Sequence, residues 1–173
     1  MGRGAGFCYR RPPREKMHTI EHTYRHGVDA VFAKLTDPDH LKRRAEAAGH
    51  ANVDVDVQST DGGTKIRLAR DITSEIPSFA KKFVDPTNRV VDELTWRDDG
   101  DGKKADFQVQ VNKRISLKGT LTLQPTDGGC EFTNRYEAKV DVPLVGKKIA
   151  GIVEDKTEEG VRDDCAFTAK ELG

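Results

Sequence analysis

Residues 90–140 read VVDELTWRDDGDGKKADFQVQVNKRISLKGTLTLQPTDGGCEFTNRYEAKV, and apolar and polar side chains alternate through four successive segments of this stretch. Successive side chains of a β-strand point to opposite faces, so each segment is predicted to be a strand with one buried and one wet face. Glycine-containing turns at 98–102 and 127–129 supply the positive φ angles of tight hairpins. The four predicted strands are 90–97, 105–111, 115–123 and 130–140.

The same alternation predicts three further strands upstream, at 19–24, 53–57 and 65–72. Helices are predicted at 28–35, 38–48 and from Pro143 to Leu172. The first has apolar residues at helical spacing, Asp37 and Pro38 begin the second, and Gly49 ends it. We therefore predict an α+β fold in which a curved seven-stranded antiparallel sheet wraps around a long C-terminal helix, with two short helices after the first strand.

The length and composition predict one globular domain. The chain has 173 residues with zero formal net charge, and it has no apolar run of the roughly 18 residues that suggest a membrane span. Residues 1–16 are basic and lack the apolar core of a secretory signal, so they are predicted to be a disordered arm before a domain at 17–173. We expect Met17 to be the natural start, and the alternative is a basic tether for anionic surfaces. Since the remainder is acidic overall, nucleic acid is not expected as a partner.

Cysteine and histidine give no metal or catalytic motif. The three cysteines are Cys8, Cys130 and Cys165, and the regularly spaced histidines are His18, His22 and His26. Cys130 and Cys165 are expected to be buried free thiols, which suits a reducing cytoplasm. On a strand, histidines four residues apart are separated by about 13 Å, too far to share one ion. We therefore predict no metal and no cofactor.

Three segments resemble a known superfamily. They are Val31–Pro38 (VFAKLTDP), Pro77–Val84 (PSFAKKFV) and Val142–Ile149 (VPLVGKKI). The first is similar to the opening of START-like (SRPBCC) proteins with the helix-grip fold, and the other two resemble an uncharacterised actinobacterial branch of that superfamily. The resemblance spans about residues 17–172. It implies a cavity between sheet and C-terminal helix that holds lipids, sterols, polyketides or quinones, although some relatives are cyclases or hydrolases, so the fold does not decide the activity.

Polar residues on the predicted apolar faces are the candidates for a site. By strand parity, Arg70, Asp92 and Asn134 lie among apolar neighbours, where an unpaired charge is costly. Arg70 and Asp92 would neutralise each other if their strands are adjacent. We predict that these three residues and Tyr136 form the polar end of a cavity. The alternative is that strand ends or bulges turn them out to solvent.

The C-terminal helix and one connection complete the predicted site. The apolar stripe of the helix is followed, on the same face, by small or polar residues, namely Lys156, Thr157, Gly160 and Asp164. Either these residues leave a cavity beneath the middle of the helix, or the C-terminal half of the helix extends beyond the sheet and is partly solvated. Phe79 and Phe83, beside Lys81 and Lys82, form either a lid or portal that touches an anionic membrane or a simple cap on the sheet. The residues predicted to bind ligand are Arg70, Phe79, Phe83, Asp92, Trp96, Phe107, Phe132, Asn134, Tyr136, Ile149 and Val153.

The favoured function is a monomeric cytoplasmic carrier or sensor that binds an apolar small molecule or lipid without catalysis. The alternative is an enzyme of the polyketide cyclase or aromatase kind, for which Asp92, Tyr136 and His22 are the titratable candidates. A third possibility is a protein-interaction role in which the cavity has closed.

Overall fold

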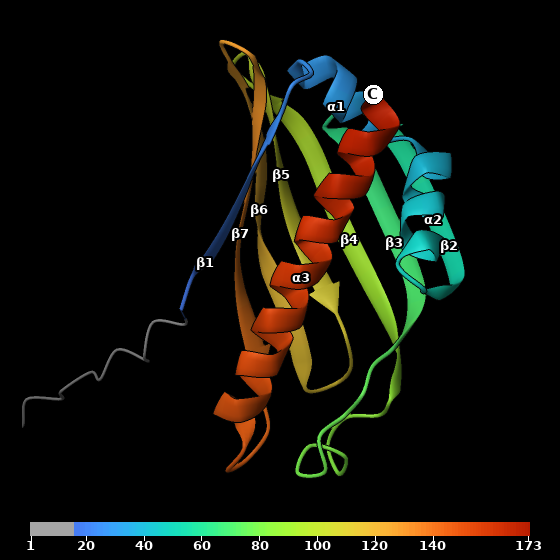
Figure 1. Ribbon diagram of the computed structural model, residues 1–173, viewed down its shortest axis with the longest axis vertical. Coiled ribbons are helices and arrows are strands. Elements are labelled where there is room, and N and C mark those ends of the chain that lie inside the picture. Colours follow the sequence, from blue (N-terminus) through green and yellow to red (C-terminus); the bar gives the residue numbers. More distant parts are fainter. Residues whose placement is uncertain (1–15) are drawn as a thin grey trace, which may run out of the picture.

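The computed structural model describes residues 16–173, and it consists of seven strands and three helices (Figure 1). The strands are β1 (His18–Tyr24), β2 (Ala51–Thr60), β3 (Gly63–Thr73), β4 (Thr87–Asp99), β5 (Gly102–Gln110), β6 (Ile115–Thr126) and β7 (Gly129–Val140). The helices are α1 (Val28–Leu35), α2 (Pro38–Ala47) and α3 (Gly146–Leu172). The predicted basic arm lies, except for Lys16, outside the described residues.

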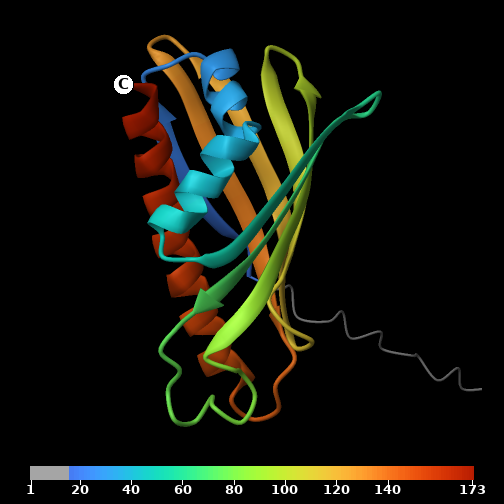
Figure 2. The same cartoon turned by 90° about the vertical axis from the view of Figure 1, so that its right-hand side faces the viewer.

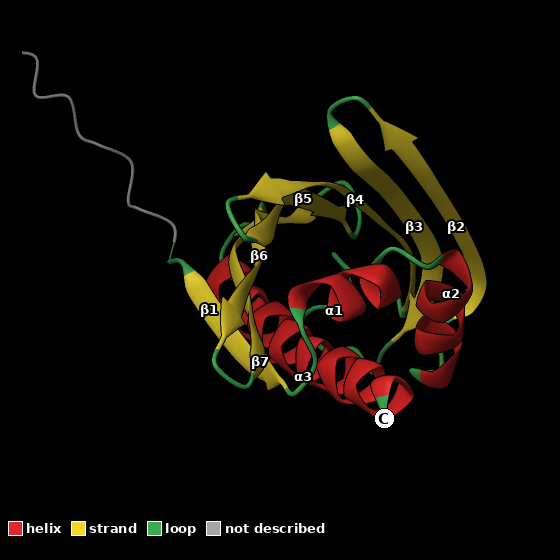
Figure 3. Cartoon of the chain, turned by 90° about the horizontal axis from the view of Figure 1, so that it is seen from above, coloured by secondary structure: helices red, strands yellow, loops and turns green. Residues whose placement is uncertain are grey.

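All seven strands form one antiparallel sheet in the order β1-β7-β6-β5-β4-β3-β2. Five hairpins link β2 to β7 in turn, whereas α1 and α2 carry the chain from β1 at one edge to β2 at the other. Viewed from above, the sheet curves around α1 and α3 (Figure 3). The predicted fold class is confirmed, including the two short helices after the first strand.

The strand parity predicted from the sequence decides which side chains form the core. Most buried residues of strands β3 to β7 share the inward parity, and they pack with Tyr24 of β1 and with α1 and α3. The close approach of β6 and β7 needs a glycine at one point, because a Cβ on Gly119 would lie 2.0 Å from the carbonyl oxygen of Arg135. Cys130 and Cys165 are buried free thiols, as predicted.

The start of α3 corrects one prediction. The helix begins at Gly146 rather than at Pro143, because Leu144 has a φ of 65°, a left-handed conformation that ends any helical geometry there. The predicted polar continuation of its stripe is also partly wrong. Lys156 and Gly160 face solvent, and the buried face instead continues through Cys165 and Thr168. Glu158 and Arg162 form the predicted surface ion pair at 2.7 Å.

No helix among the described residues is long and apolar enough to cross a membrane.

Candidate functional site

Arg70 and Asp92 form an ion pair on the inner face of the sheet. β3 and β4 are neighbours, and Arg70 Nη1 donates to Asp92 Oδ2 at 2.8 Å. Only 13% of the Arg70 side chain and 18% of the Asp92 side chain are exposed, so neither is turned out to solvent. Arg70 and Asp92 thus lie on the inner face, as strand parity predicted, and they form the ion pair that adjacent strands would allow.

A helix C-terminus brings a histidine to this pair. α2 ends in a Schellman motif, in which Gly49 (φ 82°) donates to the carbonyl of Glu46 and His50 donates to that of Ala45. This turn carries His50 into the electrostatic neighbourhood of Arg70 and Asp92. The half-buried His50 is therefore positioned by the helix end that Gly49 permits.

A second ion pair lies close to the first and joins α2 to α3. Arg44 Nε lies 3.3 Å from Asp164 Oδ2. The charge of Arg44 lowers the pKa of Asp92, and the charge of Asp164 raises it. We call the resulting group the polar cluster. Its members are Arg44, His50, Arg70, Asp92 and Asp164. Five separate positions in the sequence thus converge between the sheet and α3.

Burial controls the protonation of two members of the polar cluster. It raises the pKa of Asp92, against the lowering effect of Arg70, and it lowers the pKa of His50, with a further lowering by the charge of Arg70. In addition, Asp92 Oδ1 and His50 Nδ1 are buried atoms that lack a hydrogen-bond partner among the described residues. A buried polar atom without a partner is costly, so both atoms are available to a ligand.

Apolar side chains beside the polar cluster remain partly accessible. α3 packs against β1 and β7, and the inner face of the central strands is less completely covered. Asp92 pairs across the sheet with Val109, and Leu94 with Phe107. Val109, Leu94 and Phe107 are only half-buried although they have inward parity. The inner face therefore places half-buried apolar side chains next to a polar anchor, although Leu94 and Phe107 also touch the hollow on the outer face.

The predicted ligand residues do not form a single lining. Trp96 and Phe132 belong to the core cluster around α1, where the Trp96 ring meets Phe32 edge-on at 5.8 Å. Phe83 and Ile149 lie in a cluster at the opposite end, and Phe107 and Tyr136 lie in a third. Val153 contacts the second and third clusters, while Phe79 is 41% exposed.

The predicted grouping of Asn134 and Tyr136 with the ion pair is not formed. Both residues are on β7, which β5 and β6 separate from β4. Tyr136 donates to the backbone carbonyl of Glu154 at 3.3 Å, and its ring stacks on His18. Asn134 is buried, and its Oδ1 has no partner among the described residues, as is also true of Trp96 Nε1.

The outer face of the sheet has a hollow of about 770 Å³, but the residues that line it are mostly not those predicted to bind ligand. Of the predicted ligand residues only Phe107 touches it, and the lining is mostly charged and polar. Arg67 pairs with Asp54 at 3.5 Å on this face, and Arg97 pairs with Asp106. These contacts are typical of a solvated sheet surface, and we place the candidate site on the inner face.

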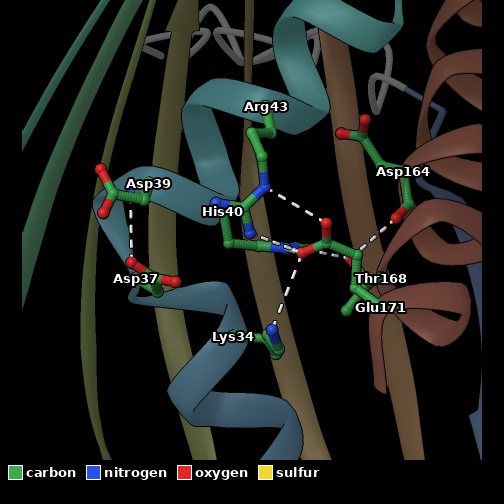
Figure 4. A network of polar contacts seen from close by, with 8 residues as sticks. All are labelled: Lys34, Asp37, Asp39, His40, Arg43, Asp164, Thr168 and Glu171. Carbon is green, nitrogen blue, oxygen red and sulfur yellow. Dashed lines mark hydrogen bonds and ion pairs between the residues drawn. The ribbon is translucent and has the colours of Figure 1, made fainter. Parts of the chain in front are cut away.

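A buried histidine fastens the C-terminal end of α3 to α2 (Figure 4). His40 is fully buried, its Nδ1 donates to Glu171 Oε2 at 2.9 Å, and its Nε2 lies 3.1 Å from Thr168 Oγ1. Arg43 Nη2 also donates to Glu171 Oε2, at 2.7 Å, and Lys34 Nζ lies 3.7 Å from the same oxygen. This network joins the C-terminal end of α3 to α1 and α2.

The network predicts a defined acid sensitivity. Hydrogen bonds from Arg43 and then His40 lower the pKa of Glu171 from 4.5 to about 2. Its stabilising effect is complete above pH 4.5 and is lost as the pH falls toward 2. Burial lowers the pKa of His40, so a separate loss begins below pH 6.5, where the unfolded chain takes up a proton. In urea unfolding we expect Glu171→Gln to remove the component between pH 4.5 and 2 and to deepen the loss below pH 6.5, because the carboxylate of Glu171 raises the pKa of His40 against the effect of burial.

Glu158→Gln, which removes the carboxylate of an exposed pair on the same helix, is the matched control and should leave the acid profile unchanged. An unchanged profile for Glu171→Gln would mean that the carboxylate adds nothing to the attachment of α3.

Sequence reasoning missed His40, Arg44 and His50. No short-range pattern marks His40 or Arg44, whose partners lie more than a hundred residues away on α3. The signal that could have indicated His50 is Gly49, because the residue after a Schellman glycine folds back against its helix.

Known structures share this fold at low sequence identity. The protein TTHA0849 from Thermus thermophilus superposes with a TM-score of 0.64 at 14% identity, covering 91% of this chain and 97% of its own. A STAR-related lipid transfer protein from Xanthomonas axonopodis gives 0.59 at 16% identity, covering 90% and 85%. Ara h 8.0201 gives 0.54 at 13% identity, covering 90% and 99%. Such identities show the fold alone.

A search of curated protein sequences finds no match. A family model described as a protein of unknown function, DUF2505, matches residues 19–172. That match covers nearly the whole described domain, including every member of the polar cluster. The chain therefore belongs to the DUF2505 family, with a START-like fold.

Proposed function

We propose that the protein binds an apolar small molecule or lipid on the inner face of the sheet, as a carrier or sensor. The observation that carries the proposal is Asp92, whose Oδ1 is buried without a partner among the described residues, beside half-buried apolar side chains. Arg70 donates a hydrogen bond to Oδ2, the other oxygen of the Asp92 carboxylate. Oδ1 can therefore accept a hydrogen bond from a ligand. A ligand hydroxyl would satisfy it.

The charge balance of the polar cluster supports a neutral ligand. Arg44 and Arg70 are matched by Asp92 and Asp164, and burial disfavours the charged form of His50. A fatty acid carboxylate would add an unpaired charge to a balanced, largely desolvated group, which costs several kcal/mol by general estimates, whereas an alcohol adds none. The STAR-related lipid transfer protein, whose name indicates lipid handling, is consistent with an apolar ligand.

The proposal is tested by binding of model amphiphiles followed through Trp96, the chain's one tryptophan, which lies on β4, four residues after Asp92, and is buried in the core. We expect dodecanol to change its fluorescence at lower concentration than dodecanoate. In Arg70→Met/Asp92→Leu, dodecanol should bind about tenfold more weakly, because one hydrogen bond to a charged group is lost.

Arg67→Met/Glu93→Leu is the matched control, because these residues are paired neighbours on the same two strands but on the outer face. It should bind dodecanol as the wild type does. If the inner and outer variants bind equally well, or if Trp96 responds to neither amphiphile, the polar cluster is not a ligand anchor. Native mass spectrometry of the protein from its own host would then identify any bound molecule independently.

One observation favours catalysis as a second candidate. Two titratable side chains, Asp92 and His50, lie together in the polar cluster, each with a buried polar atom that has no partner among the described residues, and burial raises the pKa of Asp92 toward the range in which a carboxyl can act as an acid. A cyclase or hydrolase would use them on the bound ligand. Chromatography combined with mass analysis of ligand recovered after incubation separates the two functions, because a binding protein returns the ligand chemically unchanged, whereas a hydrolase changes its mass and a cyclase changes its retention time.

A further inference from the structure

Three segments meet at the end of the molecule opposite α1 (Figures 1 and 2). They are residues 74–86 between β3 and β4, 111–114 between β5 and β6, and 141–148, which lead into α3. We call this end the basic tip. Ala80, Val111 and Val142, one from each segment, pack in one core cluster beneath it, so the three segments form a single surface.

The basic tip exposes two large apolar side chains. Among the described residues, the exposed large hydrophobic side chains are Leu144 at 106%, Met17 at 54% and Phe79 at 41%. Val142 and Val145 on either side of Leu144 pack inward in the cluster beneath the tip, whereas Leu144 projects fully into solvent. The most exposed large apolar side chain of the described residues therefore belongs to this end.

Leu144 is also held in an unfavourable backbone conformation. Its φ is 65°, a left-handed value that is uncommon for residues other than glycine, asparagine and aspartate. A glycine would adopt it without strain. Neither backbone preference nor burial among residues 16–173 explains a leucine at position 144, and such outliers concentrate at functional sites.

Basic side chains share this end of the molecule with the two apolar ones. The three segments contain six basic residues against three acidic ones, in a chain of zero net charge. The basic residues are Lys81, Lys82, Lys113, Arg114, Lys147 and Lys148, and all six are exposed. Lys148 Nζ lies 5.8 Å from the Phe79 ring centre, and the Arg114 guanidinium lies 6.0 Å from that of Phe83. Positive charge and apolar surface are thus presented together.

We propose that the basic tip docks on an anionic lipid bilayer, with Leu144 and the edge of Phe79 entering the headgroup region. A projecting leucine on a surface that also exposes six basic side chains matches the chemistry of an anionic bilayer surface. A stable protein interface instead needs a broad apolar core with few charges, which this end lacks. The surface is separate from the polar cluster, so this inference goes beyond the proposed ligand and does not depend on it.

Co-sedimentation with vesicles tests the inference. We expect the full chain to bind vesicles of about 70% phosphatidylcholine and 30% phosphatidylglycerol at about 50 mM salt, to release as salt rises, and to ignore pure phosphatidylcholine. Lys81→Glu/Lys82→Glu should weaken binding at least about tenfold, because each basic residue near the surface contributes about a fivefold factor. Leu144→Gly should also weaken it at least about fivefold while preserving or raising the thermal midpoint, because glycine relieves the strained φ.

Lys65→Glu/Lys104→Glu, two exposed lysines of the outer sheet face, is the matched charge-reversal control and should bind nearly as the wild type does. Arg70→Met/Asp92→Leu should also keep full vesicle binding, which separates this result from failure of the proposed ligand site. Absence of binding to the anionic vesicles would overturn the inference. The inference would also be overturned if Lys81→Glu/Lys82→Glu and Lys65→Glu/Lys104→Glu lost vesicle binding to the same extent, because net charge alone would then attract the chain to the vesicle.

Discussion

Replacing Arg70 with methionine is expected to lower the free energy of unfolding by about 3 kcal/mol at pH 7. This value is at the lower end of the range for breaking a buried ion pair, because both side chains are partly exposed. The loss arises because Asp92 would keep a buried carboxylate without its partner. Burial already raises the pKa of Asp92 against the opposing effect of Arg70. In Arg70→Met the pKa of Asp92 should rise further, so the penalty should shrink as the pH falls through that raised pKa and the carboxyl becomes neutral.

Adding Asp92→Leu to Arg70→Met should recover most of that loss, to within about 1 kcal/mol of the wild type. Asp92 is paired across the sheet with Leu68 on one side and Val109 on the other, so a leucine between them has apolar neighbours. A double-mutant cycle measured by urea unfolding gives the coupling energy. If the double variant is no more stable than Arg70→Met, the ion pair contributes more than mutual neutralisation. If the double variant recovers its stability but no longer binds the ligand, the ion pair serves binding rather than stability.

Replacing His40 with alanine is expected to cost about 3 kcal/mol, through the cavity left by a fully buried ring and the loss of its contacts with Glu171 and Thr168. The loss should be concentrated at the end of α3. Hydrogen exchange should therefore speed up in the last turns of that helix more than in β6 and β7. Urea unfolding and exchange measured by mass spectrometry check the two parts of this expectation.

Lys42→Ala is the matched control, because Lys42 is exposed on the same helix and should matter by less than about 0.5 kcal/mol. If His40→Ala is equally neutral, the apolar contacts of Val161, Ala169 and Leu172 hold the helix without the polar network. If His40→Ala also loosens binding at the polar cluster, the position of α3 controls access to the site.

The sequence alone determined the strands and the inward placement of the candidate anchor. Alternation is a local property, because the side-chain period of a strand is two whatever lies beside it. Trp96 and Phe132 were therefore assigned correctly to the buried face, and Asp92 was recognised as out of place among apolar neighbours. Helix α1 begins and ends as its apolar spacing predicted.

Only the tertiary structure decided which of these residues meet. Asn134 and Tyr136 share the inward face with Asp92, but two strands lie between β7 and β4. His50 and Asp164, by contrast, reach the cluster from a helix end and from the last helix. Parity gives the face of a residue and not its neighbours across the sheet, because neighbours depend on strand order and register.

The same limit explains the two ends of α3. At its start, the sequence favoured helix from Pro143, and the packing of Val142 and Val145 beneath the tip accompanies a left-handed Leu144 instead. At its end, His40 and Glu171 are 131 residues apart in sequence, so no local pattern could connect them. Local periodicity determined what each segment becomes, whereas long-range packing determined which charges are paired, which polar atoms remain open to a ligand, and which apolar side chain remains in water.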